Sequence, residues 1–343
     1  LQPGDIQVWQ PWDTPGAVQR FLAQFRPAIG ILMETEVWPN MVAVCRQQGV
    51  PLVLANARLN AHSLRKAERV GWLARPAFGG LAAVWAQSQA DADRLRQLGA
   101  PVQGIFGNLK FDATPDAALL ARGHALRERC VAVGRPVVLL ASAREGEEAE
   151  LLAALKQFRP TAAVNPPQGA SDLIANGPVQ WLIVPRHPQR FDEVEALVRQ
   201  HGFSISRRST WGPDAEPQAA DVWLGDSMGE MPLYYGLGSV ALLGGSFAPL
   251  GGQNLIEAAA CGCPVVMGPS VFNFQEAADL AAQAGAAFAV DSMAQGVQQA
   301  VALAQDTVRG AQVRAAAEQF AAAHRGAALR TAQAVQDVLG SRG

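Results

Sequence analysis

Residues 240–267 read VALLGGSFAPLGGQNLIEAAACGCPVVM and contain one complete strand–turn–helix–strand unit. The apolar run Val240–Leu243 has the length of a buried strand, and glycines follow it directly. A second pair of glycines precedes a helical stretch, after which Val265–Met267 forms the next apolar run. Strands that are apolar throughout, rather than alternating, are typical of parallel sheets covered on both faces. The unit therefore predicts an α/β fold.

The same alternation of strands and helices continues on both sides of this unit. The apolar residues of Val18–Phe25, for example, have the i, i+3, i+4, i+7 spacing of one helix face. Repeated alternation of this kind predicts doubly wound parallel sheets. The other predicted strands are Ala28–Met33, Pro51–Ala55, Ala82–Ala86, Val137–Ala141, Trp181–Val184, Val222–Leu224 and Ala286–Val290.

Length and local breaks predict two domains. A single core usually stops growing at about 250–300 residues, and this chain has 343. The helical stretch Ala117–Val131 runs into Gly134–Pro136 before a new strand begins, and this places the break near Phe111–Pro136. We therefore expect an N-terminal domain of residues 1–130, incomplete at its start, and a C-terminal domain of residues 131–343.

Three other segments differ from the alternating pattern. Thr161–Gln180 and Arg207–Ala220 are rich in Pro, Gly and polar residues, which predicts surface loops. Met293–Leu339 is rich in alanine and predicts two or three helices. These helices would close the second domain and could cross back to the first.

The composition excludes several classes of protein. Hydrophobic residues make up 49% of the chain, which excludes wholesale disorder. The 28 basic and 30 acidic residues give a net charge of -2, so we expect no nucleic-acid partner. No apolar run reaches the roughly 18 residues of a membrane span. The four cysteines are too scattered for a disulfide scaffold or a zinc site, which favours a reducing compartment.

Two patterns that suggest catalysis have simpler interpretations. Asp91 and Asp93 have the Asp-x-Asp spacing of a metal site, but they lie at a helix start that Asp91 can cap. Ser142 follows a strand but lacks the GxSxG context of a nucleophile. Glu147 and Glu148, just after it, are ordinary acids of a first helical turn. We predict no metal site.

Polar residues follow two predicted strands of the first half, and ligands of open parallel sheets bind at such strand ends. Glu34 and Glu36 come after Ala28–Met33, where one could act as a base or an electrostatic stabiliser, or simply cap the next helix. Lys110 lies in the segment GNLKFD. It is either a compact ammonium group that meets an anion or a solvated lysine of a linker.

Three segments of the second half have the same position after a strand. Arg186, after Trp181–Val184, could bind a phosphate with both arms of its guanidinium. The turn Gly225–Met231 offers free N–H groups to a base edge or phosphate, or is an ordinary capped turn. In residues 240–267, glycines let backbone N–H groups approach an anion, and Glu257 can accept from both hydroxyls of a ribose. Together these segments predict a nucleotide site.

Six motifs in register resemble those of the bacterial 3-deoxy-D-manno-octulosonic acid (Kdo) transferases over nearly the whole chain. The resemblance implies the GT-B architecture, with two Rossmann-like domains and the active site in the cleft between them. It implies metal-independent transfer of Kdo from the donor substrate CMP-Kdo to a lipid A precursor in lipopolysaccharide biosynthesis, with no cofactor. The implied place is the cytoplasmic face of the inner membrane of Gram-negative bacteria. The motifs are METEVWPN, VLANARL, GNLKFD, VPRHPQRF, GDSMGEM and GGQNLIEAAACGCPVVMGP.

The resemblance also implies site residues. Glu34 and Lys110 match the two residues held to stabilise the transition state. The positions that match the CMP-binding segments are Pro185, Arg186, Met228, Gly229, Glu230, Asn254, Leu255, Ile256 and Glu257.

The chain departs from the family pattern at its beginning. Family members carry an apolar N-terminal anchor, a first strand and a glutamate that acts as general base, and this sequence opens just upstream of Val18–Phe25. We therefore expect an N-terminally truncated copy, soluble by itself, whose own catalytic activity is in question. The alternatives are another GT-B enzyme, such as a UDP-sugar transferase or epimerase, and an inactive nucleotide-binding fragment.

Overall fold

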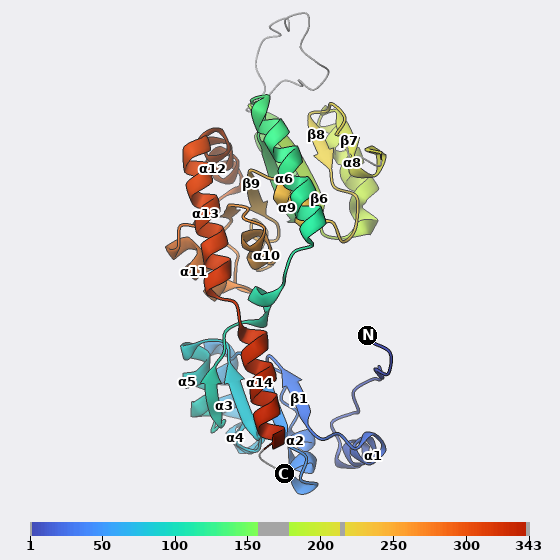
Figure 1. Cartoon of the computed structure of the whole chain (residues 1–343), viewed down its shortest axis with the longest axis vertical. Coiled ribbons are helices and arrows are strands. Elements are labelled where there is room, and N and C mark those ends of the chain that lie inside the picture. The colour runs from blue at the N-terminus through green and yellow to red at the C-terminus, as the bar shows by residue number, and fades with distance from the viewer. Residues whose placement is uncertain (1, 157–177, 213–216, 341–343) are drawn as a thin grey trace, which may run out of the picture. The chain divides into compact units, whose positions relative to one another are not determined.

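The chain forms two compact units (Figure 1). The first unit consists of Leu1–Asp112 and His324–Gly343, and the second of Ala113–Ala323. The computed structural model describes residues 2–156, 178–212 and 217–340. Most of the predicted loop Thr161–Gln180, and four residues of the predicted loop Arg207–Ala220, lie outside these ranges. None of the described helices is both long and apolar enough to cross a bilayer.

The first unit is built on a four-stranded parallel sheet in the order β1-β2-β3-β4. One face of the sheet packs on a core to which α1, α2, α3 and α5 contribute apolar side chains. The strands are β1 (Gly30–Met33), β2 (Leu52–Ala57), β3 (Ala83–Ala86) and β4 (Val102–Ile105). The helices are α1 (Pro15–Phe25), α2 (Pro39–Gln47), α3 (Ala61–Arg69), α4 (Gly71–Gly79) and α5 (Gln89–Gln97).

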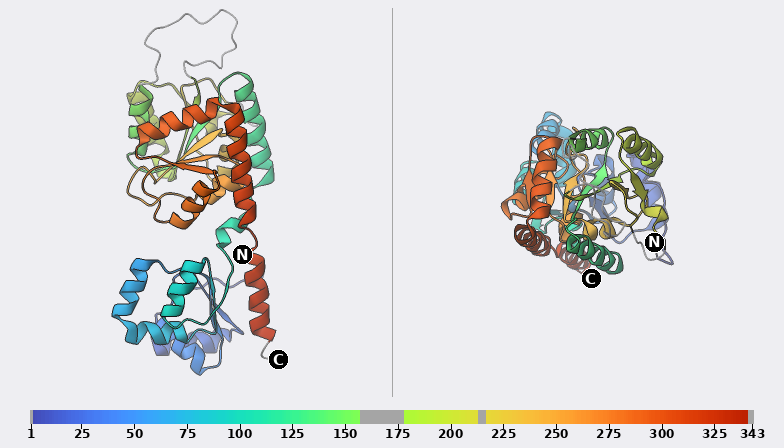
Figure 2. Two further views of the ribbon diagram at one scale, coloured as in Figure 1. Left: turned by 90° about the vertical axis from the view of Figure 1, so that its left-hand side faces the viewer. Right: turned by 90° about the horizontal axis from the view of Figure 1, so that it is seen from above.

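The opposite face of this sheet is covered by the C-terminal helix α14 (Ala327–Gly340), as Figures 1 and 2 show. Its residues Ala334, Val335 and Val338 pack against Val53, Ala55, Ala83 and Trp85 of the sheet. The short helix η1 (Leu109–Asp112) fixes the start of α14, because the carboxylate of Asp112 accepts from the backbone N–H groups of Gly326 and Ala328. Of the predicted C-terminal helices, α14 thus crosses back to the first unit, and α12 and α13 belong to the second.

The second unit contains a seven-stranded parallel sheet in the order β11-β10-β9-β5-β6-β8-β7. Helices cover both of its faces (Figure 2): α7, α8 and α12 share the core on one face, and α6 and α9 pack together on the other. The strands are β5 (Val137–Ala143), β6 (Gln180–Pro185), β7 (Ile205–Arg207), β8 (Val222–Leu224), β9 (Val240–Leu243), β10 (Val265–Met267) and β11 (Ala287–Ala289). The helices are α6 (Ala117–Ala132), α7 (Glu147–Leu155), η3 (Pro188–Arg190), α8 (Phe191–Gln200), η4 (Arg208–Thr210), α9 (Met231–Leu237), α10 (Leu255–Ala260), α11 (Gln275–Gln283), α12 (Met293–Gln305) and α13 (Thr307–Ala323).

The unit boundary differs from the predicted domain boundary at residue 130. Helix α6 belongs wholly to the second unit, because two glycines let it approach α9 closely. A Cβ at Gly123 would lie 2.4 Å from the Leu233 carbonyl oxygen, and one at Gly236 would lie 2.9 Å from that of Leu120. The division therefore falls at Asp112, before α6, and residues 324–343 join the first unit rather than the second.

The predicted fold class, with two Rossmann-like parallel sheets, is confirmed. Two short strands, β4 and β7, were not predicted. The predicted loop Arg207–Ala220 instead begins at the end of β7 and contains the buried side chain of Trp211. Asp91 is also not the cap of α5: Ser88 caps that helix, and the buried Asp91 accepts from the backbone N–H of Leu59.

Candidate active site

The strand order of the second unit reverses at β5, which lies between β6 and β9. In open parallel sheets, ligands bind outside the carboxyl ends of the strands at such a reversal. The loops that leave β6, β8 and β9 all begin at this edge of the sheet, because the strands are parallel. The structure therefore brings the predicted nucleotide-binding segments to one edge.

The loop after β9 is held by a buried carboxylate. The side chain of Glu147, in the first turn of α7, is 1% exposed and accepts hydrogen bonds from four backbone N–H groups. The four hydrogen bonds compensate the carboxylate for the loss of water, and they connect the loop after β9 to the start of α7. The donors are Arg144 (2.9 Å), Gly245 (2.8 Å), Phe247 (3.0 Å) and Ala248 (3.2 Å).

Glycine is required at the start of that loop. A Cβ on Gly244 would lie 2.3 Å from the backbone oxygen of Ser142, so the strand ends of β5 and β9 meet without room for a side chain. Ser246 connects the loop to the end of β10, because its hydroxyl accepts from the Gly268 N–H at 2.8 Å. The glycine-rich segment is thus a rigid loop fixed at both ends.

Helix α10 places the segment Asn254–Glu257. Asn254 caps the helix by accepting from the Ile256 N–H at 3.2 Å. The side chains of Leu255 and Ile256 are buried, so any contact of these two residues with a nucleotide would come from their backbone. Burial raises the pKa of Glu257, and the nearby charge of Arg186 opposes that rise. Arg186 and Glu257, from different loops, are therefore close enough to interact.

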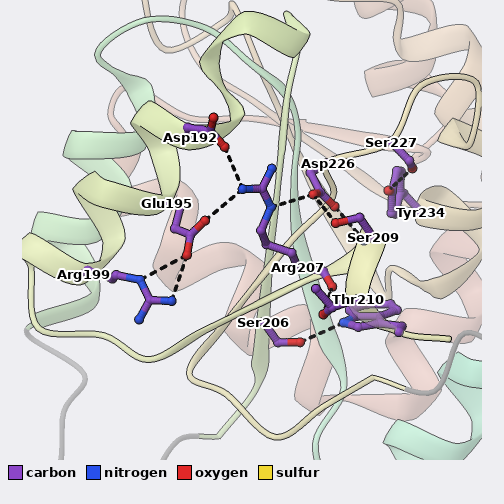
Figure 3. Close-up of polar contacts among 11 residues, drawn as sticks. Asp192, Glu195, Arg199, Ser206, Arg207, Ser209, Thr210, Asp226, Ser227 and Tyr234 are labelled. Carbon is purple, nitrogen blue, oxygen red and sulfur yellow. Dashed lines mark hydrogen bonds and ion pairs between the residues drawn. The ribbon is translucent and has the colours of Figure 1, made fainter.

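The loop after β8 presents its middle to solvent. Met228 is 62% exposed, and Gly229 has a φ of +79°, a conformation that favours glycine. Glu230 is not a free carboxylate: it pairs with Arg208 at 2.8 Å and accepts from the hydroxyl of Ser227. That hydroxyl also lies 2.5 Å from the phenol oxygen of Tyr234 (Figure 3).

The first unit brings Glu34 and Lys110 together. Glu34 directly follows β1 with a φ of +57°, and its backbone N–H bonds to the Ala55 oxygen at 3.0 Å. One oxygen of its carboxylate is 4.0 Å from the Nζ of Lys110, and the other is 3.0 Å from the Nε of Arg58. All three side chains are partly exposed. Arg58 lies in the motif VLANARL but was not predicted as a site residue.

Lys110 owes its place to Asn56, at the end of β2. The buried Asn56 has a φ of +51°, and its side-chain oxygen accepts from the Leu109 N–H at 3.1 Å. Asn108 adds a local bond, because its side-chain oxygen accepts from the Lys110 N–H at 3.0 Å. Two cations beside one carboxylate leave a net positive charge, which suits an anionic substrate group.

Within residues 2–156, 178–212 and 217–340, no group of three or more His, Cys, Asp and Glu side chains could hold a metal ion. Two Rossmann-like units, with polar loops at the strand ends of both, are the GT-B architecture of glycosyltransferases and related epimerases.

Comparison with known proteins specifies the family. A family model described as 3-deoxy-D-manno-octulosonic-acid transferase matches residues 1–113. The chain is 46% identical over 334 residues to the 3-deoxy-D-manno-octulosonic acid transferase of Bordetella pertussis, an alignment that covers 97% of this chain and 74% of that protein. The enzyme of the same name from Haemophilus influenzae is 33% identical over 298 residues, 86% of this chain and 66% of that one. The chain belongs to the Kdo transferase family.

A glycosyltransferase from Rickettsia africae ESF-5 has a similar structure, with a TM-score of 0.58 over 98% of this chain and 85% of that one. Its sequence identity is 11%, so the likeness concerns the fold alone. The assignments of Glu34 and Lys110 to catalysis, and of nine residues to CMP binding, stay predictions.

Proposed function

We propose that this chain transfers Kdo from CMP-Kdo to a lipid A precursor in lipopolysaccharide biosynthesis. The observation that carries the proposal is the 46% identity to the Bordetella pertussis enzyme, which extends over both units. The reaction is a direct displacement in which the acceptor hydroxyl gives its proton to a general base and its oxygen attacks the anomeric carbon of Kdo. CMP leaves with the electron pair of the broken bond.

The second unit would bind the nucleotide at the carboxyl ends of its strands. Arg186, which is exposed, would pair with the phosphate, and Glu257 would accept from the two ribose hydroxyls. The backbone of the two exposed residues Met228 and Gly229 would meet the base edge. Pro185 precedes Arg186 at the end of β6 and fixes the start of that loop.

The first unit would stabilise the transition state through Glu34, Arg58 and Lys110. Kdo is a sugar acid, so its own carboxylate offers Lys110 or Arg58 an anionic partner. Both oxygens of Glu34 already face cations, which suits a role in orienting Arg58 and Lys110 toward that carboxylate.

Nucleotide binding and transfer test the proposal separately. Titration calorimetry of the purified chain should show CMP binding more tightly than UMP or UDP. Tighter binding of UDP would favour the alternative of a UDP-sugar transferase or epimerase. Transfer of radiolabelled Kdo from CMP-Kdo to a lipid A precursor should fall by about 10²-fold or more in Glu34→Gln and Lys110→Met. Unchanged transfer in both variants would remove them from catalysis.

We also propose that the first unit associates with the cytoplasmic face of the inner membrane, where a lipid acceptor would be found. Helices α3 and α4 expose basic and apolar side chains next to one another. Each basic residue near an anionic membrane surface contributes about 1 kcal/mol to binding. Apolar side chains that insert into the interface strengthen the binding further. The basic residues are Arg65, Lys66, Arg69 and Arg75, and the apolar ones are Val70, Trp72 and Leu73.

Co-sedimentation with vesicles tests this association. Vesicles that contain phosphatidylglycerol should bind the chain, and vesicles of phosphatidylcholine alone should bind it less. Trp72→Ser should weaken binding, because Trp72 is 79% exposed beside the basic residues. Leu329→Ser, at a 77% exposed apolar side chain of α14, is the matched control and should not. Equal loss in both variants would contradict a specific role for α3 and α4.

A further inference from the structure

Two consecutive arginines, Arg207 and Arg208, lie where the edge strand β7 passes into η4. Their side chains reach the two ends of the loop that follows β8, residues 226–230. Arg207 binds Asp226, which opens the loop, and Arg208 binds Glu230, which closes it. The exposed Met228 and Gly229 lie between these two anchors.

Arg207 is the centre of the larger network, which Figure 3 shows. Its Nε is 2.6 Å from the Asp226 carboxylate, and another nitrogen bonds to Asp192 (2.7 Å) and Glu195 (3.0 Å) of α8. The Asp226 side chain is 2% exposed and also accepts from the backbone N–H (2.8 Å) and hydroxyl (2.6 Å) of Ser209. Burial alone would raise the pKa of Asp226, but the bonds from Ser209 and Arg207 outweigh it and lower the pKa.

Arg208 also contacts an aromatic ring on its other side. Its guanidinium lies over the ring of Trp211, 5.8 Å from the centroid. Trp211 is itself fixed, because its indole N–H donates to Ser206 at 2.8 Å and its ring meets Trp223 edge-on. The second anchor of the loop therefore rests on a buried aromatic pair.

The arginines are not needed to pair the edge strand with the sheet. Strand β7 already joins β8 through a parallel backbone ladder from Ile205 to Arg207. What the two side chains add is a fixed start and a fixed end for five residues whose middle faces solvent. A loop that is already ordered loses less conformational freedom when it binds a ligand.

We propose that Arg207 and Arg208 are positioning residues for the nucleotide, because they hold Asp226 and Glu230 so that the backbone of Met228 and Gly229 presents its edge to the base. This rests on the proposed function, in which the same loop contacts CMP. Neither arginine needs to touch the nucleotide, and the two act on opposite ends of the loop.

The test compares CMP affinity with stability in the full chain. Arg207→Ala and Arg208→Ala should each raise the Kd for CMP by about 10-fold, because binding would then have to order one or two loop residues that the arginines now hold. Calorimetry is done well below the unfolding midpoint of each variant. Arg207→Lys and Arg208→Lys keep the positive charge and should disturb folding less than the alanine variants. They should recover part of the CMP affinity that those variants lose. Arg199→Ala is the control: Arg199 binds Glu195 in the same network, is 60% exposed and does not reach the loop.

Hydrogen exchange in the nucleotide-free chain separates this inference from the proposed function. The amides of residues 226–230 should exchange faster in the two alanine variants, while those of residues 245–248 should not change. Unchanged exchange there, or a lowered unfolding midpoint with an unchanged Kd, would overturn the positioning role. Faster exchange in a chain that binds no CMP would support the anchoring and contradict the proposed function instead.

Discussion

At the level of single residues, the loop after β9 depends on the carboxylate of Glu147. Four N–H groups point at it, so an amide in its place would turn an –NH₂ group toward other donors. We expect Glu147→Gln to destabilise the second unit by about 1–3 kcal/mol, the cost of leaving buried donors unsatisfied. Calorimetric unfolding measures this loss. Glu150→Gln, at an exposed position of the same helix, should change the midpoint little, and equal effects would contradict the role of Glu147.

The pH dependence of CMP binding should reflect the protonation of the Glu257 carboxylate. An ionised carboxylate accepts from both ribose hydroxyls, whereas a protonated one accepts less well. Because burial raises the pKa of Glu257, its protonation as pH falls begins at a higher pH than for an ordinary glutamate. CMP affinity should therefore fall toward low pH, and this part of the profile should be absent in Glu257→Gln.

Titration calorimetry across the pH range checks this expectation. The nucleotide phosphate also titrates, but it does so equally with both proteins, and the difference between the two profiles isolates Glu257. Parallel profiles would exclude Glu257 as the titrating group.

At the level of secondary-structure elements, the packing of α6 on α9 depends on two glycines. A Cβ on Gly123 would meet the backbone of α9 rather than a flexible side chain, so the helices would have to separate. Gly123→Ala should destabilise the second unit by about 1–3 kcal/mol, although alanine is the better helix former. Calorimetric unfolding measures the change. Gly71→Ala, whose Cβ would meet only the side chain of Arg75, should be neutral or stabilising.

The elements that the sequence predicted well are those whose burial can be inferred from a local run of apolar residues. Continuous apolar runs such as Val137–Ala141 announce strands covered on both faces, and all nine predicted strands are present. Strand β7, with the sequence ISR, carries no such signal because it is three residues long and ends in an arginine. The sequence could not place the unit boundary more closely than Phe111–Pro136, because the contact of α6 with α9 is made by glycines, which no periodicity marks.

The residues of the candidate site also divide into those that local sequence indicated and those that it did not. Glu34, Lys110, Arg186 and Glu257 could be proposed as candidates because each follows a strand or opens a helix in a recognisable motif. Glu147 was discounted, since an acid in a first helical turn has the same sequence signal whether it meets solvent or a loop. Arg58 did carry a usable signal, its place after β2. Arg207 and Arg208 act through partners that only the tertiary fold brings near.

At the level of the whole molecule, the first unit depends on the last helix of the chain. Val335 of α14 packs on the sheet face formed by Val53, Ala55, Ala83 and Trp85. Val335→Asp would place a charge against this apolar face, where Val335 is partly buried, and we expect it to unfold the first unit while leaving the second intact. The variant should aggregate more readily, yet CMP affinity should not change.

Leu329→Asp is the matched control for this prediction, because the exposed Leu329 lies on the same helix. It should unfold like the unaltered chain. Calorimetric scans of the two variants, together with light scattering, make the comparison. A variant at Val335 that keeps both transitions would mean that α14 is dispensable for the first unit.

The place of α14 also sets an order of events while the protein is being made. The four strands of the first unit leave the ribosome early, but the helix that covers their second face follows only after Ala113–Ala323. At about 5–20 residues per second, those roughly two hundred residues take on the order of 10–40 s to translate. During that interval Trp85 and its neighbours stay uncovered. The nascent first unit should therefore be a client for chaperones until α14 has been made, although its four strands are synthesised before the second unit.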